Sequence, residues 1–293
     1  MIRRRSIPEL STQLVSGLGD YLAYREAEEE TYQRRRDFER GLIQNRDSFT
    51  VEGFCYPCRR QVEFLVDFQY ASGEGNERTP NWRERLVCPR CGLNNRMRAV
   101  IQLAEECFEL QKHSRLYLTE ATTALYRWFA DRYPGVIGSE RLGDSAPLGT
   151  VNESGLRNED VTRLTFADGE FDLVASFDVF EHVPNYRRAL EECHRILRPG
   201  AGFLFTVPFR ADSQKNVVRA VQHGDGKIEH LLPPQYHGDP LNPEGCLAFY
   251  EFGWEILDQL REIGFSTAEA YLYWSPELGY LGEEQIAFAA VRA

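Results

Sequence analysis

The chain has 293 residues, of which 42% are hydrophobic, and its formal net charge is −11. This length and hydrophobic content suffice for one large core and a smaller module. The negative charge disfavours broad nucleic-acid binding, and no apolar run approaches the ~20 residues that span a bilayer. The start lacks an apolar signal core, and the seven cysteines are an odd number. We therefore expect a soluble, cytoplasmic protein without a disulfide framework.

Residues 1–48 are polar and predict an N-terminal helical segment of one or two helices. The arginine clusters Arg3–Arg5 and Arg34–Arg36 are local exceptions to the acidic balance. Arg34 follows Glu30 by four residues, which is the spacing of an ion pair on a helix surface. This spacing favours surface pairing over an RNA-binding patch.

Residues 49–97 differ in character and form a separate predicted module. The alternation of Val62, Phe64, Val66 and Phe68 predicts a strand, and a polar loop follows it. Helical spacing then returns over residues 98–112.

Two Cys-x-x-Cys pairs lie in this module, Cys55 with Cys58 and Cys88 with Cys91. Two residues between thiolates allow one tight turn to offer both sulfurs to one ion, so two such turns predict a structural Zn²⁺ site of the zinc-ribbon kind. The alternatives are four unrelated buried cysteines or a redox pair. The neighbouring Arg98 is expected at the surface, solvated or paired with carboxylates, or else reaching an acidic substrate group.

From about residue 114 the pattern alternates between strand and helix, with strands expected at 115–118, 135–138, 171–176 and 202–207. A helix follows Pro184, and another spans Phe249 to Gly264. This alternation predicts an α/β fold with a mostly parallel sheet and helices on both faces. Such sheets bind ligands at the carboxyl ends of their strands.

Residues 160–209 contain three ordered motifs, Asp160 to Asp172, Phe177 to Val183, and Leu197 to Ala201. Together they resemble the class I S-adenosylmethionine-dependent methyltransferases, specifically the type-11 group. The resemblance implies a Rossmann-like domain over residues 98–293, with a mostly parallel seven-stranded sheet and a substrate-cap insertion at about 210–250.

The resemblance also implies roles for cofactor-binding residues. Glu140, after the second strand, matches the acid that accepts the ribose hydroxyls, and a carboxylate can accept two hydrogen bonds at once. Asp160 matches the acid beside the adenine amino group, with the Val161 amide next to it. Phe177 and Asp178 match the position where the fourth strand opens toward the methionine end of the cofactor.

The first loop departs from the family pattern, because Thr119, Glu120, Ala121 and Thr122 replace its usual glycines. Glycine there lets the backbone approach the cofactor closely. Either cofactor binding has been lost, or the side chains take part, with Glu120 receiving the ammonium and the threonine hydroxyls the carboxylate. Because Glu140 and Asp160 are both present, we favour binding.

The run Asp178, Glu181 and His182 has two interpretations. It resembles an acid-x-x-Glu-His run of ubiquinone-type and small-RNA methyltransferases, which implies a Mg²⁺ ion that polarises the acceptor hydroxyl. Many relatives with Glu-His-Val at this point use no metal, and there these residues begin a helix or line the cofactor pocket. We favour the metal-free interpretation.

The insertion at about 210–250 contains candidates for a general base. Neutral histidine suits that role, and we place His237 first, oriented by Asp239, with His223 or His230 in reserve. The alternative is that the prolines and glycines here only form turns, with the histidines satisfied locally.

We therefore expect a methyltransferase that moves a methyl group from S-adenosylmethionine to a small-molecule acceptor, most simply a hydroxyl. One alternative is an RNA methyltransferase that uses the zinc ribbon as a clamp, which the net charge disfavours. The other is a non-catalytic scaffold whose cofactor site has degenerated.

Overall fold

The computed structural model describes residues 7–143 and 146–293. The cluster Arg3–Arg5 and the chain start, for which sequence expectations were given, lie outside the described residues. The chain divides into two compact units. The first comprises residues 1–15, 22–109 and 271–287, and the second comprises 16–21, 110–270 and 288–293. This grouping differs from the predicted segments, because the tip of a C-terminal hairpin belongs to the first unit.

The helical prediction for the N-terminal segment is confirmed by α1 (Leu18–Ala27) and α2 (Glu29–Leu42). A short strand, β1 (Thr12–Val15), precedes them and was not predicted. Arg34 and Glu30 form the expected ion pair, with nitrogen and oxygen 3.8 Å apart and both side chains exposed. Such exposed pairs contribute little to stability.

An antiparallel sheet organises the rest of the first unit. Its strands are β2 (Ser48–Cys55), β3 (Arg60–Asp67) and β4 (Leu86–Val87). The register pairs Phe49 with Val66 and Cys55 with Arg60. The other elements are the 3₁₀ turn η1 (Gly75–Glu77), α3 (Trp82–Arg85) and α4 (Asn95–Cys107). Helix α4 begins earlier than predicted, because the Asn94 side chain accepts a hydrogen bond from the Met97 amide at 2.9 Å and caps it.

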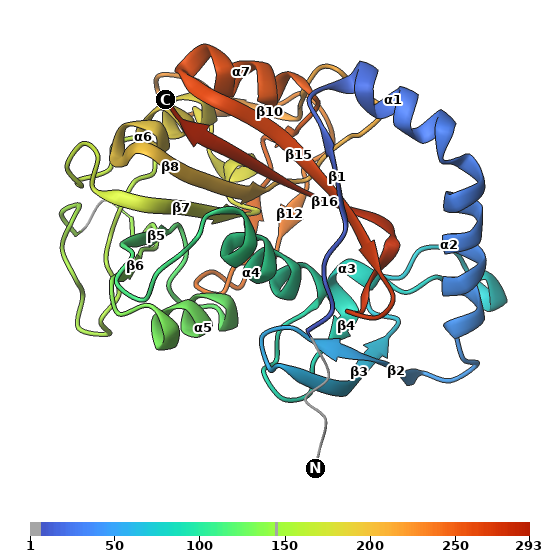
Figure 1. Cartoon of the computed structure of the whole chain (residues 1–293). Coiled ribbons are helices and arrows are strands. Elements are labelled where there is room, and N and C mark those ends of the chain that lie inside the picture. Colours follow the sequence, from blue (N-terminus) through green and yellow to red (C-terminus); the bar gives the residue numbers. More distant parts are fainter. Residues whose placement is uncertain (1–6, 144–145) are drawn as a thin grey trace. The chain divides into compact units, whose positions relative to one another are not determined.

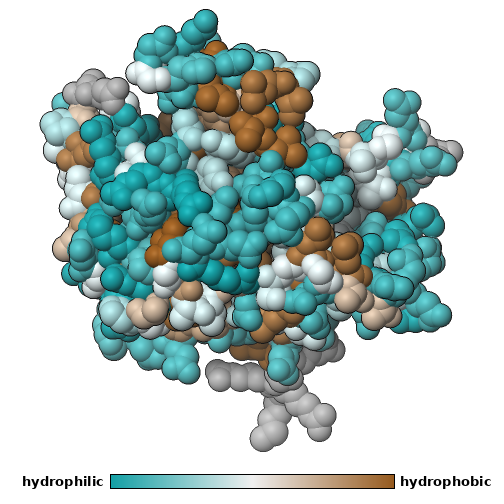
Figure 2. All heavy atoms as spheres, turned by 90° about the horizontal axis from the view of Figure 1, so that it is seen from above, coloured by the Kyte–Doolittle hydropathy of each residue, from teal (hydrophilic) through white to brown (hydrophobic). Residues whose placement is uncertain are grey.

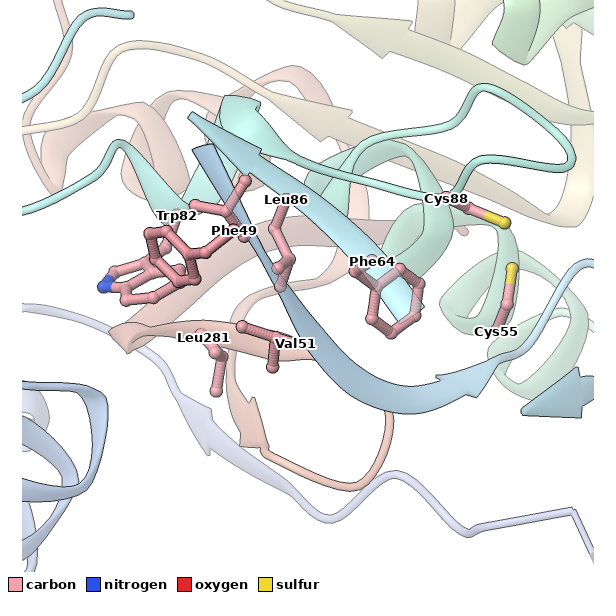
Figure 3. Packing of buried hydrophobic residues seen from close by; sticks show 9 residues of the cluster. Phe49, Val51, Cys55, Phe64, Trp82, Leu86, Cys88 and Leu281 are labelled. Atoms are coloured by element: carbon pink, nitrogen blue, oxygen red, sulfur yellow. The ribbon is translucent and has the colours of Figure 1, made fainter. Parts of the chain in front are cut away.

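One apolar cluster fills this unit. Figure 3 shows that Cys55 and Cys88 lie at one end of it, with their sulfur atoms directed toward each other. Its buried members are Phe49, Val51, Cys55, Phe64, Val66, Trp82, Leu86, Cys88 and Leu281. The cysteine pairs are thus continuous with the core of the unit.

Arg98 is fully buried, so its predicted surface position is wrong. Its guanidinium donates to the carbonyl oxygens of Leu278 at 2.7 Å and Gly279 at 2.9 Å, and it lies 3.8 Å from the centre of the Phe64 ring. Carbonyl dipoles and the ring face therefore replace the water around this charge.

Glu39 of α2 is buried against the tip of the C-terminal hairpin within the same unit. Its Oε1 accepts hydrogen bonds from Trp274 Nε1 and the Gly282 amide, both at 2.7 Å, and from the Glu283 amide at 2.9 Å. Burial raises the pKa of this carboxyl group, and the three donors oppose that effect. The carboxylate holds an irregular stretch near the start of β16 (Tyr280–Arg292), where Gly282 and Glu283 both have a positive φ.

A mixed sheet carries the parallel strands of the second unit. Among the described residues the sheet has seven strands in the order β1-β15-β16-β8-β7-β5-β6. The strands after β1 are β5 (Leu116–Leu118), β6 (Val136–Gly138), β7 (Phe171–Phe177), β8 (Leu197–Thr206), β15 (Phe265–Ser275) and β16 (Tyr280–Arg292). The four strands predicted from sequence are all present, and the α/β fold class is confirmed.

Strands β6, β5, β7 and β8 are parallel, whereas β16 runs antiparallel to β8. The helices are α5 (Ala124–Arg132), α6 (Tyr186–Ile196) and α7 (Glu255–Ile263). Figure 1 shows α6 and α7 on one side of the sheet and α5 on the other. The carboxyl ends of the parallel strands therefore share one edge, as open α/β sheets require.

The predicted insertion at about 210–250 is present as short hairpins. Its strands are β9 (Val217–Val218), β10 (Ala220–Gln222), β11 (Ile228–His230), β12 (Tyr236–His237), β13 (Cys246–Leu247) and β14 (Tyr250–Glu251). Several large apolar side chains of the insertion are exposed, including Leu231, Leu232 and Tyr236.

Figure 2 shows one face of the molecule, which is mostly hydrophilic with separate hydrophobic patches. Among the described residues no helix is long and apolar enough to cross a membrane.

Glu39→Ala should reduce the free energy of unfolding by about 3 kcal/mol. The substitution leaves buried N–H donors without an acceptor, whereas in the parent protein they bond to a charged carboxylate. Glu39→Gln keeps an oxygen acceptor at the same place and should cost less than half as much. Urea unfolding of both variants checks this. Equal destabilisation by the two variants would show that side-chain volume, not hydrogen bonding, matters at this position.

Candidate functional site

The loop after β5 is tied to the end of β6 by one carboxylate. The Glu140 Oε1 accepts hydrogen bonds from the Ala121 amide at 2.8 Å, the Thr122 amide at 3.0 Å and the Thr122 hydroxyl at 2.9 Å. The second oxygen, Oε2, accepts no hydrogen bond from the part of the chain that the structure describes. Glu140 therefore holds the loop through Oε1, and Oε2 can accept a hydrogen bond from a ligand.

The threonines of this loop also have defined partners. The Thr119 hydroxyl donates to the Ser176 hydroxyl on β7 at 2.9 Å, and the Thr123 side chain accepts from the Tyr126 amide at 3.1 Å, which caps α5. Gly138 leaves room beside the loop, since an added Cβ would lie 2.5 Å from the Glu120 carbonyl oxygen. Side-chain hydrogen bonds thus order a loop that lacks the glycines of the family pattern.

Asp160 and Val161 lie in a tight turn near this edge. The Asp160 Oδ1 accepts from the Thr162 amide at 2.9 Å and from the Thr162 hydroxyl at 2.6 Å. Burial raises the pKa of Asp160, but these hydrogen bonds and the charges of Arg141 and Arg163 more than offset it, so the net shift is downward. The carboxyl group is therefore held ionised.

Phe177 and Asp178 follow at the end of β7. Phe177 is buried, and Asp178 has a φ of 55°, a left-handed conformation that few side chains adopt. Its Oδ1 accepts from the Thr206 hydroxyl at 2.8 Å, and its amide donates to the Thr206 carbonyl at 2.9 Å. The strained residue is therefore held by the end of the neighbouring strand, as residues at functional sites often are.

The edge that these residues form is acidic. Glu120, Glu140, Asp160 and Asp178 follow strands or turns at the carboxyl side of the sheet, and none is fully buried. A ligand with an ammonium or sulfonium group has the complementary charge. The donors and acceptors present thus suit the cofactor that the sequence resemblance implies.

A second group of polar side chains is built on η2 (Phe180–His182). The Glu181 Oε1 lies 3.4 Å from His237 Nδ1 and 3.6 Å from His182 Nε2. The two imidazole rings meet edge to face, with centroids 4.9 Å apart. The adjacent carboxylate of Glu181 raises the pKa of His237, while burial opposes this effect.

The insertion carries His237 to this position. Strand β12 pairs with β13, where His237 faces Cys246, and the segment 247–249 contacts η2 at two points. The His182 Nδ1 donates to the Leu247 carbonyl at 2.8 Å, and the Phe249 amide donates to the Glu181 carbonyl at 2.6 Å. The adjacent residues Glu181 and His182 thereby contact His237, which lies 55 positions after His182 in the sequence.

The predicted partners of these residues differ from the observed ones. Asp178 is not in the cluster that brings Glu181, His182 and His237 together, because its carboxylate is engaged by Thr206. Asp239 does not orient His237, since its Oδ1 accepts from the Leu241 amide in a turn at 2.8 Å. The sequence could not indicate Glu181 as the partner of His237, because the contact depends on how the insertion folds back.

The two reserve candidates for a base lie on another hairpin. His223 pairs with Glu229 at 2.9 Å, and both side chains are exposed. His230 is also exposed and faces Ala220 in the β10–β11 pair. Neither belongs to the cluster around Glu181.

The predicted cysteine pairs form one cluster in the first unit. The sulfur atoms of Cys55 and Cys91 are 3.8 Å apart, and those of Cys58 and Cys88 are 3.9 Å apart. A tetrahedral zinc ion with Zn–S bonds of about 2.3 Å separates its sulfur ligands by about 3.8 Å. None of the cysteines forms a disulfide. The spacing therefore fits a closed four-thiolate zinc site.

The two knuckles share one backbone feature. The residue after the second cysteine of each is left-handed, Arg59 with a φ of 53° and Gly92 with a φ of 71°. The Gly92 amide donates to the Cys88 carbonyl at 2.9 Å, and the Arg90 amide to the Cys88 sulfur at 3.4 Å. Such turns direct two sulfurs and their nearby amides to a single point.

Part of the second unit is similar to known proteins. Residues 126–205 match the family described as "Methyltransferase domain". The chain is 51% identical over 47 residues to a sarcosine/dimethylglycine N-methyltransferase of Halorhodospira halochloris, covering 16% of this chain and 17% of that protein. It is 31% identical over 100 residues to the protein of that name from Aphanothece halophytica, covering 32% and 31% of the two chains. The chain thus spans less than a third of the length of either relative.

A solved structure also resembles the chain. It is an S-adenosylmethionine-dependent methyltransferase from Mesorhizobium loti, with 17% identity and a TM-score of 0.40, covering 66% of this chain and all of that one.

Glu140→Ala should speed hydrogen exchange at the Ala121 and Thr122 amides by about 10–100-fold, because a charge-assisted hydrogen bond contributes about 1.5–3 kcal/mol. Thr122→Val is the matched control, since it removes only the hydroxyl bond to the same oxygen. Exchange measured by NMR checks this. Unchanged rates at both amides in Glu140→Ala would contradict the tether.

Proposed function

We propose that this protein, which carries a class I S-adenosylmethionine-dependent methyltransferase domain, transfers a methyl group from S-adenosylmethionine to a hydroxyl of a small-molecule acceptor. The observation that carries the proposal is the acidic carboxyl edge of the sheet, where Glu140 orders the loop after β5 and keeps one oxygen for a ligand. The cofactor brings an activated methyl sulfonium, so the protein has mainly to bind and align the reactants.

Different residues are assigned to different parts of the cofactor. We assign the ribose hydroxyls to Glu140 Oε2 and the adenine end to the turn at Asp160 and Val161. The acidic side chains Glu120 and Asp178 face the cationic methionine end, together with Phe177. The hydroxyls of Thr119 and Thr122 are engaged within the protein, so the loop amides and Glu120 are better placed than the hydroxyls to meet the cofactor.

The cluster around Glu181 supports a hydroxyl as the acceptor. Transfer to oxygen forms an O–CH₃ bond, breaks the S–CH₃ bond and releases the hydroxyl proton, with S-adenosylhomocysteine as the other product. An alcohol therefore needs a group that lowers its pKa or accepts its proton. Glu181 and His182 offer such chemistry four and five residues beyond the end of β7, and His237 offers it from the insertion.

A second candidate is transfer to the nitrogen of a small amine. The names of the two similar proteins, both sarcosine/dimethylglycine N-methyltransferases, favour it. An unprotonated amine carries its own lone pair and needs no strong base. A panel of small hydroxyl and amine acceptors with labelled S-adenosylmethionine distinguishes the two, because label in an ether or ester supports the first and label in a substituted amine the second.

We also propose that Cys55, Cys58, Cys88 and Cys91 bind a structural zinc ion. The sulfur spacing and the matched knuckles support it. All four positions of a tetrahedral ion would be filled by thiolates, so the ion would stabilise the first unit without taking part in chemistry. The acidic net charge of −11 weighs against use of this module as an RNA clamp.

Calorimetric titration with S-adenosylmethionine and S-adenosylhomocysteine should give one site with micromolar affinity. Glu140→Gln keeps an oxygen for the loop amides but replaces the second acceptor by a donor, so affinity should fall about 10-fold or more. Glu153→Gln, which changes an exposed acid in a loop, should bind normally. Absence of heat with both ligands for folded protein would leave a non-catalytic scaffold as the better account.

The purified protein should contain about one zinc per chain. Cys88→Ser should lose that zinc and lower Tm by roughly 5–10 °C, since structural zinc contributes folding free energy. Cys107→Ser, outside the cluster, is the control and should keep both. Metal analysis and thermal unfolding give the two readouts, and full zinc occupancy in Cys88→Ser would contradict the assignment.

A further inference from the structure

We propose that Glu181, His182 and His237 bind one divalent first-row transition metal ion, at a site distinct from the cysteine cluster. The sequence favoured a metal-free site, with a Mg²⁺ ion at Asp178, Glu181 and His182 as the alternative; the proposed ligand set differs from that alternative, because His237 of the insertion takes the place of Asp178. The three side chains all belong to the second unit. Binding of the ion stands by itself, whereas its role toward an acceptor rests on the proposed function.

The strongest observation is the environment of Glu181. Its side chain is fully buried, and neither carboxylate oxygen has a hydrogen-bond partner among the described residues. An ionised carboxylate in that position is costly unless a positive charge or several donors compensate it. Buried polar groups without partners are rare enough that each calls for an explanation, of which a bound ion is one.

The two histidine contacts do not satisfy this carboxylate as hydrogen bonds would. Charge-assisted N–H···O bonds are about 2.7–2.9 Å long, whereas the nitrogen atoms lie 3.4 and 3.6 Å from Oε1. Two ligand atoms that each lie about 2.1 Å from a tetrahedral ion are about 3.4 Å apart. The observed separations therefore match ligands of a shared ion, as the sulfur separations do in the cysteine cluster.

His182 is prepared to act as a ligand. A carbonyl oxygen can only accept, so the hydrogen bond to Leu247 places the proton of the neutral ring on Nδ1. The Nε2 atom, which faces Glu181, then carries the lone pair. Fixing the tautomer of a ligating histidine through a carbonyl is the usual arrangement around protein metal ions.

His237 also has a polar partner on its other ring nitrogen. Its Nδ1 faces Glu181, and the side-chain nitrogen of Gln235 lies 3.3 Å from its Nε2. Ligation through Nδ1 therefore requires the Gln235 amide to turn its oxygen toward the ring, where Nε2 can donate to it. The side chain is half-buried, so an ion could reach the cluster from the solvent side.

The donor set identifies the class of ion. Two imidazole nitrogens and one carboxylate suit Mn²⁺, Fe²⁺, Co²⁺, Ni²⁺ or Zn²⁺, whereas Mg²⁺ prefers oxygen ligands in octahedral geometry. Three protein ligands also leave at least one coordination position open, which is the pattern of catalytic rather than structural sites. A Lewis acid there would lower the pKa of an acceptor hydroxyl.

The test uses full-length protein with zinc in the cysteine site, titrated with Co²⁺ by calorimetry and visible spectroscopy. We expect one further equivalent of Co²⁺ with nitrogen and oxygen ligation and no thiolate-to-cobalt absorption in the near ultraviolet. His237→Gln should weaken binding about 100-fold, since even a partner of a metal ligand contributes 10–100-fold. His230→Gln, an exposed histidine of the same insertion, should bind as the parent does.

Two outcomes would overturn the proposal. One is the absence of a second cobalt equivalent, or a second equivalent that His237→Gln leaves unchanged. The other is competition by Mg²⁺ at least as effective as that by Zn²⁺, which would favour a magnesium site at the acid-x-x-Glu-His run. Glu181→Gln provides an independent variant, checked for folding by thermal unfolding.

S-adenosylmethionine binding is measured in the same samples. Cobalt binding without cofactor binding would leave the metal site intact and refute the proposed function. Cofactor binding without a second cobalt equivalent would refute the metal site alone.

Discussion

A charged side chain that leaves water must find compensation inside the protein, and this constraint explains much of how both units are built. In the first unit, Glu39 is compensated by amide donors of a hairpin tip and Arg98 by carbonyl acceptors and an aromatic face. In the second, Glu140 is compensated by the amides of the loop after β5. The contacts of Glu39 hold an irregular stretch of β16, those of Arg98 hold the turn before it, and those of Glu140 hold the loop after β5.

Glu181 of the second unit is a buried charged side chain that lacks such compensation. It is as fully buried as Arg98, yet its carboxylate oxygens have no hydrogen-bond donors among the described residues. The same segment makes two backbone-directed contacts with the insertion, through the Leu247 carbonyl and the Phe249 amide. The protein thus holds the surroundings of this carboxylate rigidly while leaving the carboxylate itself uncompensated, an arrangement that suits a bound cation.

The loop after β5 shows how one function can be met by different residues. Glycine would give that loop its freedom of conformation, whereas here threonine hydroxyls and one carboxylate give it order. Close approach is retained at another position, because Gly138 on β6 makes room for the loop backbone. The loop departs from the family pattern in sequence, but its hydrogen bonds account for its form.

The sequence alone determined the elements with local signals. Alternation and helical spacing predicted strands β3, β5, β6, β7 and β8 and the helices between them. The hydrophobic periods of strands and helices depend only on residues that are close together in the sequence. The spacing within each Cys-x-x-Cys pair likewise predicted the cysteine cluster, since two residues fix a turn.

Only the tertiary structure decided what depends on distant parts of the chain. It buried Arg98, divided the hairpin of β15 and β16 between two compact units, and gave His237 the carboxylate of Glu181 rather than that of Asp239. No local period reports such pairings, because they follow from where an insertion folds back and which groups must share a partner once water is excluded.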